Sequence, residues 1–341
     1  MPKLRVLVVD DDPAYRLILS KVLSGLPNVE LVSVAANLTI ARAKLERDRF
    51  DVVTIDVVLR DESGLDLLPW IHAHHPSIFS ILLTAGTHRE ASLAVDSLLL
   101  GASTLIIKPT GEHPVKELTD ALQSALAEVV PTEKPIDVSR PIRPNSAKSE
   151  SATRELIAVG ASTGGPPVLL QFLIGLPLGF DVPIVITQHM PALHIPYFID
   201  LLARQSGRKV VLGEHGARVE RGCVYVAGEA KHLLVNRVGN GLVLAQDGGP
   251  EEHNCRPAVD PMFRSVAQAC GAASVGVVMT GMGSDGALGA RALREKGAPV
   301  VAQDQASSVV WGMPGAVAAL GAATAIVPAS QLAGCVVRWT S

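Results

Sequence analysis

The sequence predicts an α/β protein with two doubly wound parallel sheets, one in each of two domains. Apolar runs of strand length alternate with amphipathic stretches of helix length along most of the chain. This alternation stops once, between Val130 and Arg154, where four prolines and several serines and lysines replace it. A chain of 341 residues is also too long for one ordinary core. We therefore expect domains at 1–125 and 153–341, joined by a linker at 126–152.

Five apolar runs mark the strands of the first domain, and a helical pattern follows each of them. The runs are RVLVV, LVSVA, DVVTID, SILLT and TLIIK. Five such βα repeats predict a doubly wound parallel sheet of the flavodoxin-like type.

The same rhythm returns after the linker, in ELIAVGAS, VPIVITQH, CVYVAG, SVGVVMTG, PVVAQD and a last strand near Ile326. These runs predict a second parallel sheet, of the Rossmann-like type. The stretch HLLVNRVGNGLVLA differs, because two alternating runs flank Gly239-Asn240-Gly241. Alternation on both sides of such a turn indicates a β-hairpin, so the second domain is expected to contain a hairpin besides its parallel sheet.

Charge and composition exclude several classes of protein. The net charge of −3 gives no electrostatic case for nucleic acid or an anionic membrane surface as a partner. No apolar run approaches the roughly 20 residues that span a bilayer. The four cysteines show no CxxC spacing, and the first residues form a strand pattern rather than a secretory signal. We therefore expect a cytoplasmic protein without membrane insertion.

Charged and polar residues follow the strands of the first domain. Asp10 and Asp11 come after the first run, whereas the third, fourth and fifth runs end in Asp56, Thr84 and Lys108. The carboxyl ends of parallel strands meet at one sheet edge, where such sheets place their ligands. Carboxylates there can hold Mg²⁺ and leave positions for phosphoryl oxygens. Helix capping alone would explain one aspartate, but not a lysine and a threonine at the same edge.

As a set, the stretch LVVDDDPAYR and the residues at the other strand ends resemble the two-component receiver family over roughly residues 1–125. The resemblance implies phosphoryl transfer to Asp56, with Lys108 on the phosphoryl group and Thr84 as the hydroxyl that follows it. It further implies Mg²⁺ as the cofactor of this step, with the ligands Asp10, Asp11 and Asp56.

Two features depart from the receiver pattern. After the third strand the family usually has Met-Pro and Asp-Gly, whereas this chain reads VVLRDESG and keeps only Gly64. The family also carries an aromatic residue three positions before the lysine, where this chain has Leu105. The resemblance therefore carries over the phosphorylation pocket, but not an aromatic partner for the threonine.

The second domain begins with a serine in a glycine-rich turn, Ser162 in the stretch AVGASTGGPP. Such a turn can hold a phosphate on its backbone N–H groups or present a hydroxyl for chemistry. The serine turn lacks the lysine of a P-loop. A different stretch, GMGSDG at 281–286, matches the GxGxxG pattern of dinucleotide sites. It follows a strand, opens a helix and precedes a strand that ends at Asp304, which is the context such a site requires. A nucleotide-dependent oxidoreductase is therefore one hypothesis for this domain.

Acyl transfer is the alternative, because a serine nucleophile needs a base and the base needs an orienting acid. Ser162, His189 and Asp285 each follow a different predicted strand, so one sheet edge can collect all three. A regulated binding module without activity is a third hypothesis. Metal catalysis is the weakest, since His189 and His194 lack HExxH spacing and no cysteines are paired for zinc.

In this order, GASTGGP, ITQHMP, HNCRPAVDPMF and TGMGSDG resemble the chemotaxis protein-glutamate methylesterase family, and the match extends over essentially the whole chain. The resemblance implies Ser162 as nucleophile, His189 as general base and then acid, and Asp285 as orienting carboxylate. It also implies the Met282 N–H as an oxyanion donor. The implied reaction is hydrolysis of glutamyl methyl esters on chemoreceptors, without a cofactor, and deamidation of receptor glutamines uses the same logic.

The resemblance also implies how the two domains work together. The phosphodonor is expected to be a chemotaxis histidine kinase, and the substrate the cytoplasmic helices of methyl-accepting chemoreceptors. The unphosphorylated first domain is expected to pack near the crevice of Ser162 and to restrict access to it. Phosphorylation of Asp56 would then shift the protein toward the open form.

Overall fold

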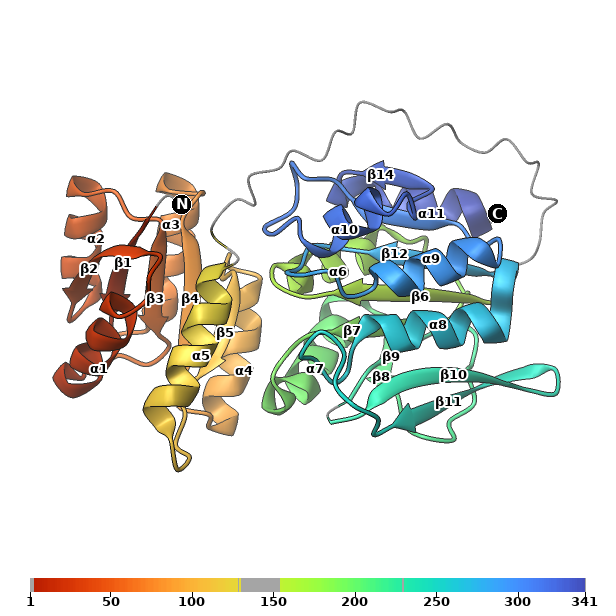
Figure 1. The fold of residues 1–341 in the computed structure, drawn as a ribbon, viewed down its shortest axis with the longest axis horizontal. Coiled ribbons are helices and arrows are strands. Elements are labelled where there is room, and N and C mark those ends of the chain that lie inside the picture. The colour runs from red at the N-terminus through yellow and green to blue at the C-terminus, as the bar shows by residue number, and fades with distance from the viewer. Residues whose placement is uncertain (1–2, 128, 130–153, 229, 341) are drawn as a thin grey trace. The chain divides into compact units, whose positions relative to one another are not determined.

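The computed structural model describes residues 3–127, 129, 154–228 and 230–340, and it contains two compact units (Figure 1). The units comprise residues 1–133 and 134–341, and each is described by itself. The linker predicted at 126–152 falls almost entirely outside the described residues. Among the described residues, no helix combines the length and the apolar character needed to cross a bilayer.

The first domain is a five-stranded parallel sheet with helices on both faces (Figure 1). The strand order β2-β1-β3-β4-β5 confirms the predicted doubly wound fold. Its elements are β1 (Leu4–Val9), α1 (Pro13–Ser24), β2 (Val29–Ala35), α2 (Leu38–Arg47), β3 (Val52–Asp56), the 3₁₀ turn η1 (Gly64–Asp66), α3 (Leu67–His74), β4 (Phe79–Thr84), α4 (His88–Leu98), β5 (Thr104–Ile107) and α5 (Pro114–Ala127).

The central strands of this sheet explain why the five apolar runs could be recognised. Every residue of β3 and β4 is buried, as expected for parallel strands that are covered by helices on both faces. The helix after β1 begins where a side chain caps it, because Asp12 accepts a hydrogen bond from the N–H of Ala14. This capping role separates Asp12 from the two aspartates that precede it.

The second domain is a seven-stranded parallel sheet with a separate two-stranded hairpin. The sheet order is β14-β13-β12-β6-β7-β9-β8, which confirms the predicted fold class. Its elements are β6 (Leu156–Ala161), α6 (Gly165–Gly175), β7 (Ile184–Gln188), η2 (Ala192–His194), α7 (Ile195–Ser206), β8 (Lys209–Leu212), β9 (Cys223–Val226), β10 (His232–Val238), β11 (Gly241–Asp247), α8 (Val259–Cys270), η3 (Gly271–Ala273), β12 (Ser274–Val278), α9 (Ala287–Glu295), β13 (Val300–Gln303), α10 (Met313–Ala319), β14 (Ala325–Val327), η4 (Ala329–Gln331) and α11 (Leu332–Thr340).

One detail of this domain confirms the sequence pattern and another differs from it. The hairpin of β10 and β11 is antiparallel as predicted, and α8 packs against it (Figure 1). Strand β8 was not predicted, because it has only four residues, lies at the sheet edge and is only partly buried. A short edge strand of this kind carries little of the apolar pattern that identifies a central strand.

The order of the strands defines where a ligand can enter the second domain. From β6 the chain continues on one side to β7, β9 and β8, whereas β12, β13 and β14 lie on the other side. The direction of winding therefore reverses between β6 and β12. Open α/β sheets bind ligands at the carboxyl ends of the strands beside such a switch point.

Candidate active site

The first domain gathers three charged side chains at the carboxyl edge of its sheet. The Lys108 ammonium donates hydrogen bonds to Asp10 Oδ2 at 2.9 Å and to Asp56 Oδ2 at 2.6 Å. Asp10 follows β1 and Asp56 ends the adjacent strand β3, so the strand register brings them together. A Cβ at Gly64 would lie 1.8 Å from the carbonyl oxygen of Asp56, which explains why glycine is needed in the loop after β3.

The carboxylates of this acid cluster could hold a divalent cation. Asp10, Asp11 and Asp56 each offer an oxygen, and these oxygens lie within 4.8 Å of one another. Burial is the main reason that the pKa of Asp56 is raised to about 6, and the charge on Asp10 adds to it, although Lys108 acts in the other direction. Hard carboxylate oxygens of this kind suit Mg²⁺, so the residues present fit the predicted ion.

Thr84 is fully buried at the end of β4, beside the lysine strand. Its hydroxyl has no hydrogen-bond partner among the described residues, while its carbonyl accepts from the Lys108 N–H at 2.7 Å. Leu105, at the position without an aromatic residue, is also buried. An aromatic ring reaches the lysine from another direction, because the Lys108 ammonium lies 4.4 Å from the centre of the Tyr15 ring.

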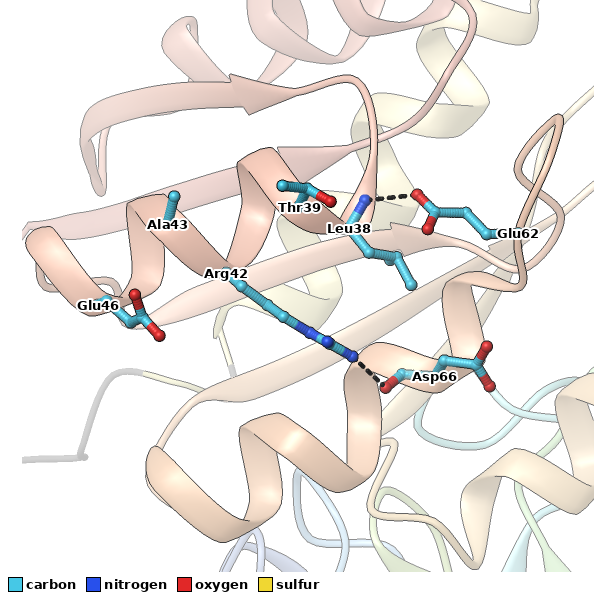
Figure 2. A pocket seen from close by; sticks show the side chains of 7 residues that line it. All are labelled: Leu38, Thr39, Arg42, Ala43, Glu46, Glu62 and Asp66. Atoms are coloured by element: carbon cyan, nitrogen blue, oxygen red, sulfur yellow. Dashed lines mark hydrogen bonds between the residues drawn. The ribbon is translucent and has the colours of Figure 1, made fainter.

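A groove on the first domain lies along α2, outside this cluster. Figure 2 shows Arg42 reaching from α2 toward Asp66, and Glu62 reaching toward the start of the same helix. Arg42 donates to the carbonyl oxygen of Asp66 at 3.3 Å, and Glu62 accepts from the Leu38 N–H at 2.7 Å. None of the predicted phosphorylation residues lines this groove, so it does not belong to the acid cluster.

In the second domain, the strand register places Ser162 beside His189. Strands β6 and β7 are parallel, with Ala161 opposite Gln188, and the next residue on each strand is one of the predicted pair. The His189 N–H donates to the carbonyl of Ala161 at 3.0 Å, and the Gln188 side chain donates to the carbonyl of Ser162 at 2.8 Å. No hydrogen bond joins the Ser162 hydroxyl to His189 within the described residues, a link that often tightens only when substrate binds.

Glycines let the chain turn tightly after Ser162. Gly164 has a φ of +72° and precedes α6, a conformation that favours glycine. A Cβ at Gly165 would lie 2.3 Å from the Gln188 side-chain oxygen, so the turn could not approach β7 so closely with a larger residue. The serine therefore lies where the helix begins, at the switch point between β6 and β12.

His189 and Asp285 are in direct contact. The two side chains share a hydrogen bond of 2.8 Å between Nε2 and Oδ2, which leaves Nδ1 of the imidazole for another partner. Burial disfavours the charged imidazole, but the hydrogen bond to Asp285 and the neighbouring Cys255 thiol outweigh this effect and raise the pKa of His189 to about 9. The structure thus brings together the predicted base and its orienting acid.

Asp285 owes its charge to the backbone around it. The carboxylate is 1% exposed and accepts hydrogen bonds from the N–H groups of Val259, Asp260 and Gly286 at 2.7 to 2.9 Å. Burial alone would raise its pKa, but His189 and the two N–H groups at the start of α8 outweigh burial, so the pKa of Asp285 is lowered. An anion at a helix N-terminus is also stabilised by the helix dipole.

The loop after β12 supplies a candidate oxyanion donor. The Met282 N–H forms no hydrogen bond within the described part of the chain, whereas its neighbour Gly281 is fixed, because its carbonyl accepts from Gly312 and Met313 at 3.0 and 2.8 Å. A Cβ at Gly281 would lie 2.7 Å from the Cβ of Ser162, so the loop passes directly beside the serine turn. A free N–H at this place is what an oxyanion site requires.

The same geometry bears on the alternative of nucleotide binding. The first glycine of GMGSDG packs against Ser162, and Asp285 within the motif is occupied by hydrogen bonds. Asp304, the acid expected to bind a ribose, accepts from the Ser307 N–H and hydroxyl at 3.0 and 2.6 Å and so closes a turn. The arrangement favours acyl transfer over a dinucleotide site.

His194 takes no part in this site. It is fully buried, neither ring nitrogen has a hydrogen-bond partner among the described residues, and burial lowers its pKa. A buried neutral histidine of this kind is typical of a packing role.

Several residues that support the site were not identified from the sequence. Thr280 is buried and joins three segments, because it accepts from the Ser162 N–H through its carbonyl, donates its hydroxyl to the carbonyl of Thr163 and donates its N–H to the side chain of Gln303. Its position in the motif TGMGSDG could have indicated a role at the site, but its hydrogen-bond partners lie far away in the sequence. The other unidentified residues at the site are Gln188, Cys255, His253 and Asp260.

Comparison with known proteins identifies both domains. Residues 157–336 match the family model described as CheB methylesterase, and residues 6–123 match the one described as response regulator receiver domain. The chain is 37% identical to a protein-glutamate methylesterase/protein-glutamine glutaminase of Trichodesmium erythraeum, with 99% of each chain covered. It is 38% identical to a protein of the same name from Nocardioides sp., over 97% of this chain and 94% of the relative.

A solved structure supports the fold of the second domain. The CheB methylesterase catalytic domain of Thermotoga maritima is similar with a TM-score of 0.53 and 32% sequence identity. The similarity covers 55% of this chain and 98% of that chain.

Proposed function

The chain belongs to the CheB methylesterase family and carries a response regulator receiver domain, and from this premise we propose how its residues perform the reaction. The protein is a protein-glutamate methylesterase/protein-glutamine glutaminase, a hydrolase of chemotaxis adaptation. Its substrates are glutamyl methyl esters on the cytoplasmic part of chemoreceptors. The observation that carries the mechanism is the hydrogen bond between His189 and Asp285. His189 follows strand β7, and Ser162 follows the adjacent strand β6 at the same register.

In the proposed reaction, Ser162 Oγ attacks the ester carbonyl carbon while Nδ1 of His189 accepts the hydroxyl proton. The carbonyl oxygen becomes an oxyanion, which the Met282 N–H stabilises. The acyl–oxygen bond then breaks, and His189 returns the proton to the methoxide, so that methanol leaves. Water attacks the acyl-enzyme by the same route and releases glutamate, and Asp285 stabilises the imidazolium in both steps.

For regulation we propose that the receiver domain, residues 1–125, accepts a phosphoryl group on Asp56 from a chemotaxis histidine kinase. Asp10, Asp11 and Asp56 would hold Mg²⁺, which when bound supplies the charge that neutralises phosphoryl oxygens. The ammonium that now bridges Asp10 and Asp56 would pair with the new phosphoryl group. The hydroxyl of Thr84, which has no hydrogen-bond partner among the described residues, would follow it. Residues 126–152 would form the linker, and 153–341 the hydrolase.

The nucleophile can be tested by methanol release from a methylated receptor fragment. We expect Ser162→Ala to lower kcat by about 10⁶-fold, as removal of the serine does in subtilisin, while the fold is retained. A fluorophosphonate should label the wild-type chain at Ser162 and not this variant. Near-normal turnover by Ser162→Ala would refute the assignment of the nucleophile.

The regulatory site can be tested in the same assay with a small-molecule phosphodonor. We expect phosphorylation to raise turnover within the range of about 5–150-fold that allosteric couplings usually span. Asp56→Asn should remain at the resting rate whether or not the phosphodonor is present, because an amide cannot form the acyl phosphate. Stimulation of Asp56→Asn by the phosphodonor would show that another residue receives the phosphoryl group.

A further inference from the structure

A second histidine–aspartate pair lies beside the first one. His253 Nε2 and Asp260 Oδ2 share a hydrogen bond of 2.9 Å, and the same histidine nitrogen lies 4.0 Å from Oδ1 of Asp285. Asp260 is fully buried, whereas the His253 side chain is 30% exposed. The mechanism described above uses neither residue of this pair.

Asp260 connects the helices on both sides of the catalytic acid. Its Oδ1 accepts from the Gly289 N–H in α9 at 2.6 Å, so the carboxylate ties the first turn of α8 to α9. Its own N–H donates to Asp285 at 2.9 Å. Movement of Asp260 would therefore move one of the N–H groups that hold the catalytic carboxylate.

His253 lies in a backbone segment that is kept in an unusual conformation. His253 and Asn254 have φ angles of +54° and +57°, in the left-handed region that few residues other than glycine adopt. Such conformations persist where the surrounding structure imposes them, and they are frequent at functional sites. The next residue, Cys255, interacts with the imidazole of His189. The segment thus approaches the catalytic pair through His253 and Cys255, which are separated by one residue.

Charge explains why a histidine suits this place. Asp260 and Asp285 are two buried carboxylates near one another. Burial is the main cause that raises the pKa of Asp260, and the charge of Asp285 adds to it, while the Gly289 N–H and His253 oppose the rise. Arg264 of α8, which pairs with Glu252, also interacts electrostatically with both aspartates. His253 is the side chain that donates a hydrogen bond directly to Asp260.

We propose that His253 and Asp260 are a positioning pair, which fixes Asp285 and, through it, the orientation of His189. The proposal rests on the proposed function of Ser162, His189 and Asp285. His253 holds the Asp260 carboxylate in place, and the start of α8 then presents its N–H groups to the catalytic acid. Neither member of the pair contacts the reacting atoms.

A different role for the pair can be separated from this one. The Ser284 hydroxyl lies 3.5 Å from His253 Nδ1, so Ser284, His253 and Asp260 follow one another in the order of a catalytic triad. The 3.5 Å contact is too long for a strong hydrogen bond, and Ser284 is exposed. The geometry favours positioning, and an active Ser284 becomes one outcome of the test.

The test compares two substitutions of equal size in the full-length protein. His253→Met removes the donor to Asp260, whereas His253→Gln keeps an N–H group in the same region. We expect His253→Met to lower kcat by about 10²-fold with KM unchanged, the size of effect that a misplacement of about 1 Å produces. His253→Gln should recover most of this loss. His215→Ala, which changes an exposed histidine with one backbone contact, should leave kcat unchanged.

A spectroscopic signal makes the result independent of turnover. The proton between His189 Nε2 and Asp285 should give a downfield ¹H resonance, which we expect to shift or disappear in His253→Met and to persist in His253→Gln. Equal kcat values and an unchanged resonance in the two variants would overturn the positioning role. If Ser162→Ala stays active, the proposed function fails instead, whatever the His253 variants do.

Ser284→Ala completes the experiment. It should change kcat by less than about twofold, because a contact of 3.5 Å contributes little. Fluorophosphonate labelling of the Ser162→Ala variant that disappears in the Ser162→Ala, Ser284→Ala double variant would show that His253 activates a second nucleophile. That outcome would replace the positioning role.

Discussion

Asp56 of the receiver domain and Asp285 of the hydrolase domain follow strands of similar parallel sheets, but their pKa values move in opposite directions. Asp56 is 7% exposed, and burial raises its pKa to about 6. Asp285 is 1% exposed, yet its pKa is lowered. The more deeply buried carboxylate is therefore the one that keeps its charge more firmly.

The difference lies in the donors around each carboxylate. Asp285 accepts from His189 and from three backbone N–H groups, which are fixed by two helix starts. Asp56 receives a hydrogen bond from Lys108, an ammonium that it shares with Asp10, and one backbone hydrogen bond from Val58. Donor count and rigidity, more than burial, determine the charge. The first arrangement suits a permanent anion, and the second suits the proposed role of Asp56, which is to bind a cation and then a phosphoryl group.

The substitution with the largest expected effect on this comparison is Asp285→Asn. The amide keeps the shape but can stabilise the wrong tautomer of His189, an effect of about 10⁴ in kcat for the corresponding change in a serine protease. We expect a loss of this size in methanol release, with little change in KM. A loss confined to KM would show that Asp285 contacts substrate or serves only to cap α8.

The two sites also differ in how much of them could be predicted from the sequence. In the receiver domain Asp56 is the last residue of β3, and Lys108 directly follows β5, so strand ends alone predict their meeting. In the hydrolase domain Asp285 lies seven residues beyond β12. Its contact with His189 depends on a loop that no periodicity describes. Strand ends therefore gave the three residues as one hypothesis among several, and the resemblance to a family selected it.

The contacts that support the hydrolase site could not be predicted from the sequence, for a physical reason. Thr280 reaches Gln303 and the loop near Val310, and these contacts depend on the path of a long loop rather than on any repeating pattern. His253 contacts Asp260, seven residues further along the chain. This contact depends on the left-handed backbone at His253 and Asn254, which the sequence does not indicate. The fold class followed from strand patterns, whereas the network behind the catalytic acid required the structure.

The next test uses the pKa of His189, which its contact with Asp285 helps to raise to about 9. The base must be neutral to accept the serine proton, so activity is lost as pH falls below this value. We expect kcat/KM for ester hydrolysis to rise by about tenfold between pH 7 and 8, by about 50-fold in all between pH 7 and 9, and then to level off. In Asp285→Asn the midpoint should move toward the ordinary histidine value. A midpoint that stays near 9 in this variant would mean that another group controls the profile.

The smallest expected effect concerns the receiver carboxylate. A proton on Asp56 competes with a cation at the acid cluster, and the ionised fraction falls as pH drops through about 6. We expect Mg²⁺ affinity of the full-length protein, measured by titration calorimetry, to fall by about fourfold between pH 7 and pH 5.5 from this competition. Asp56→Asn should bind Mg²⁺ more weakly and lose this dependence on pH. If wild-type affinity is the same at both pH values, Asp56 is already ionised at pH 5.5, and the contrast with Asp285 in the cation-free state disappears.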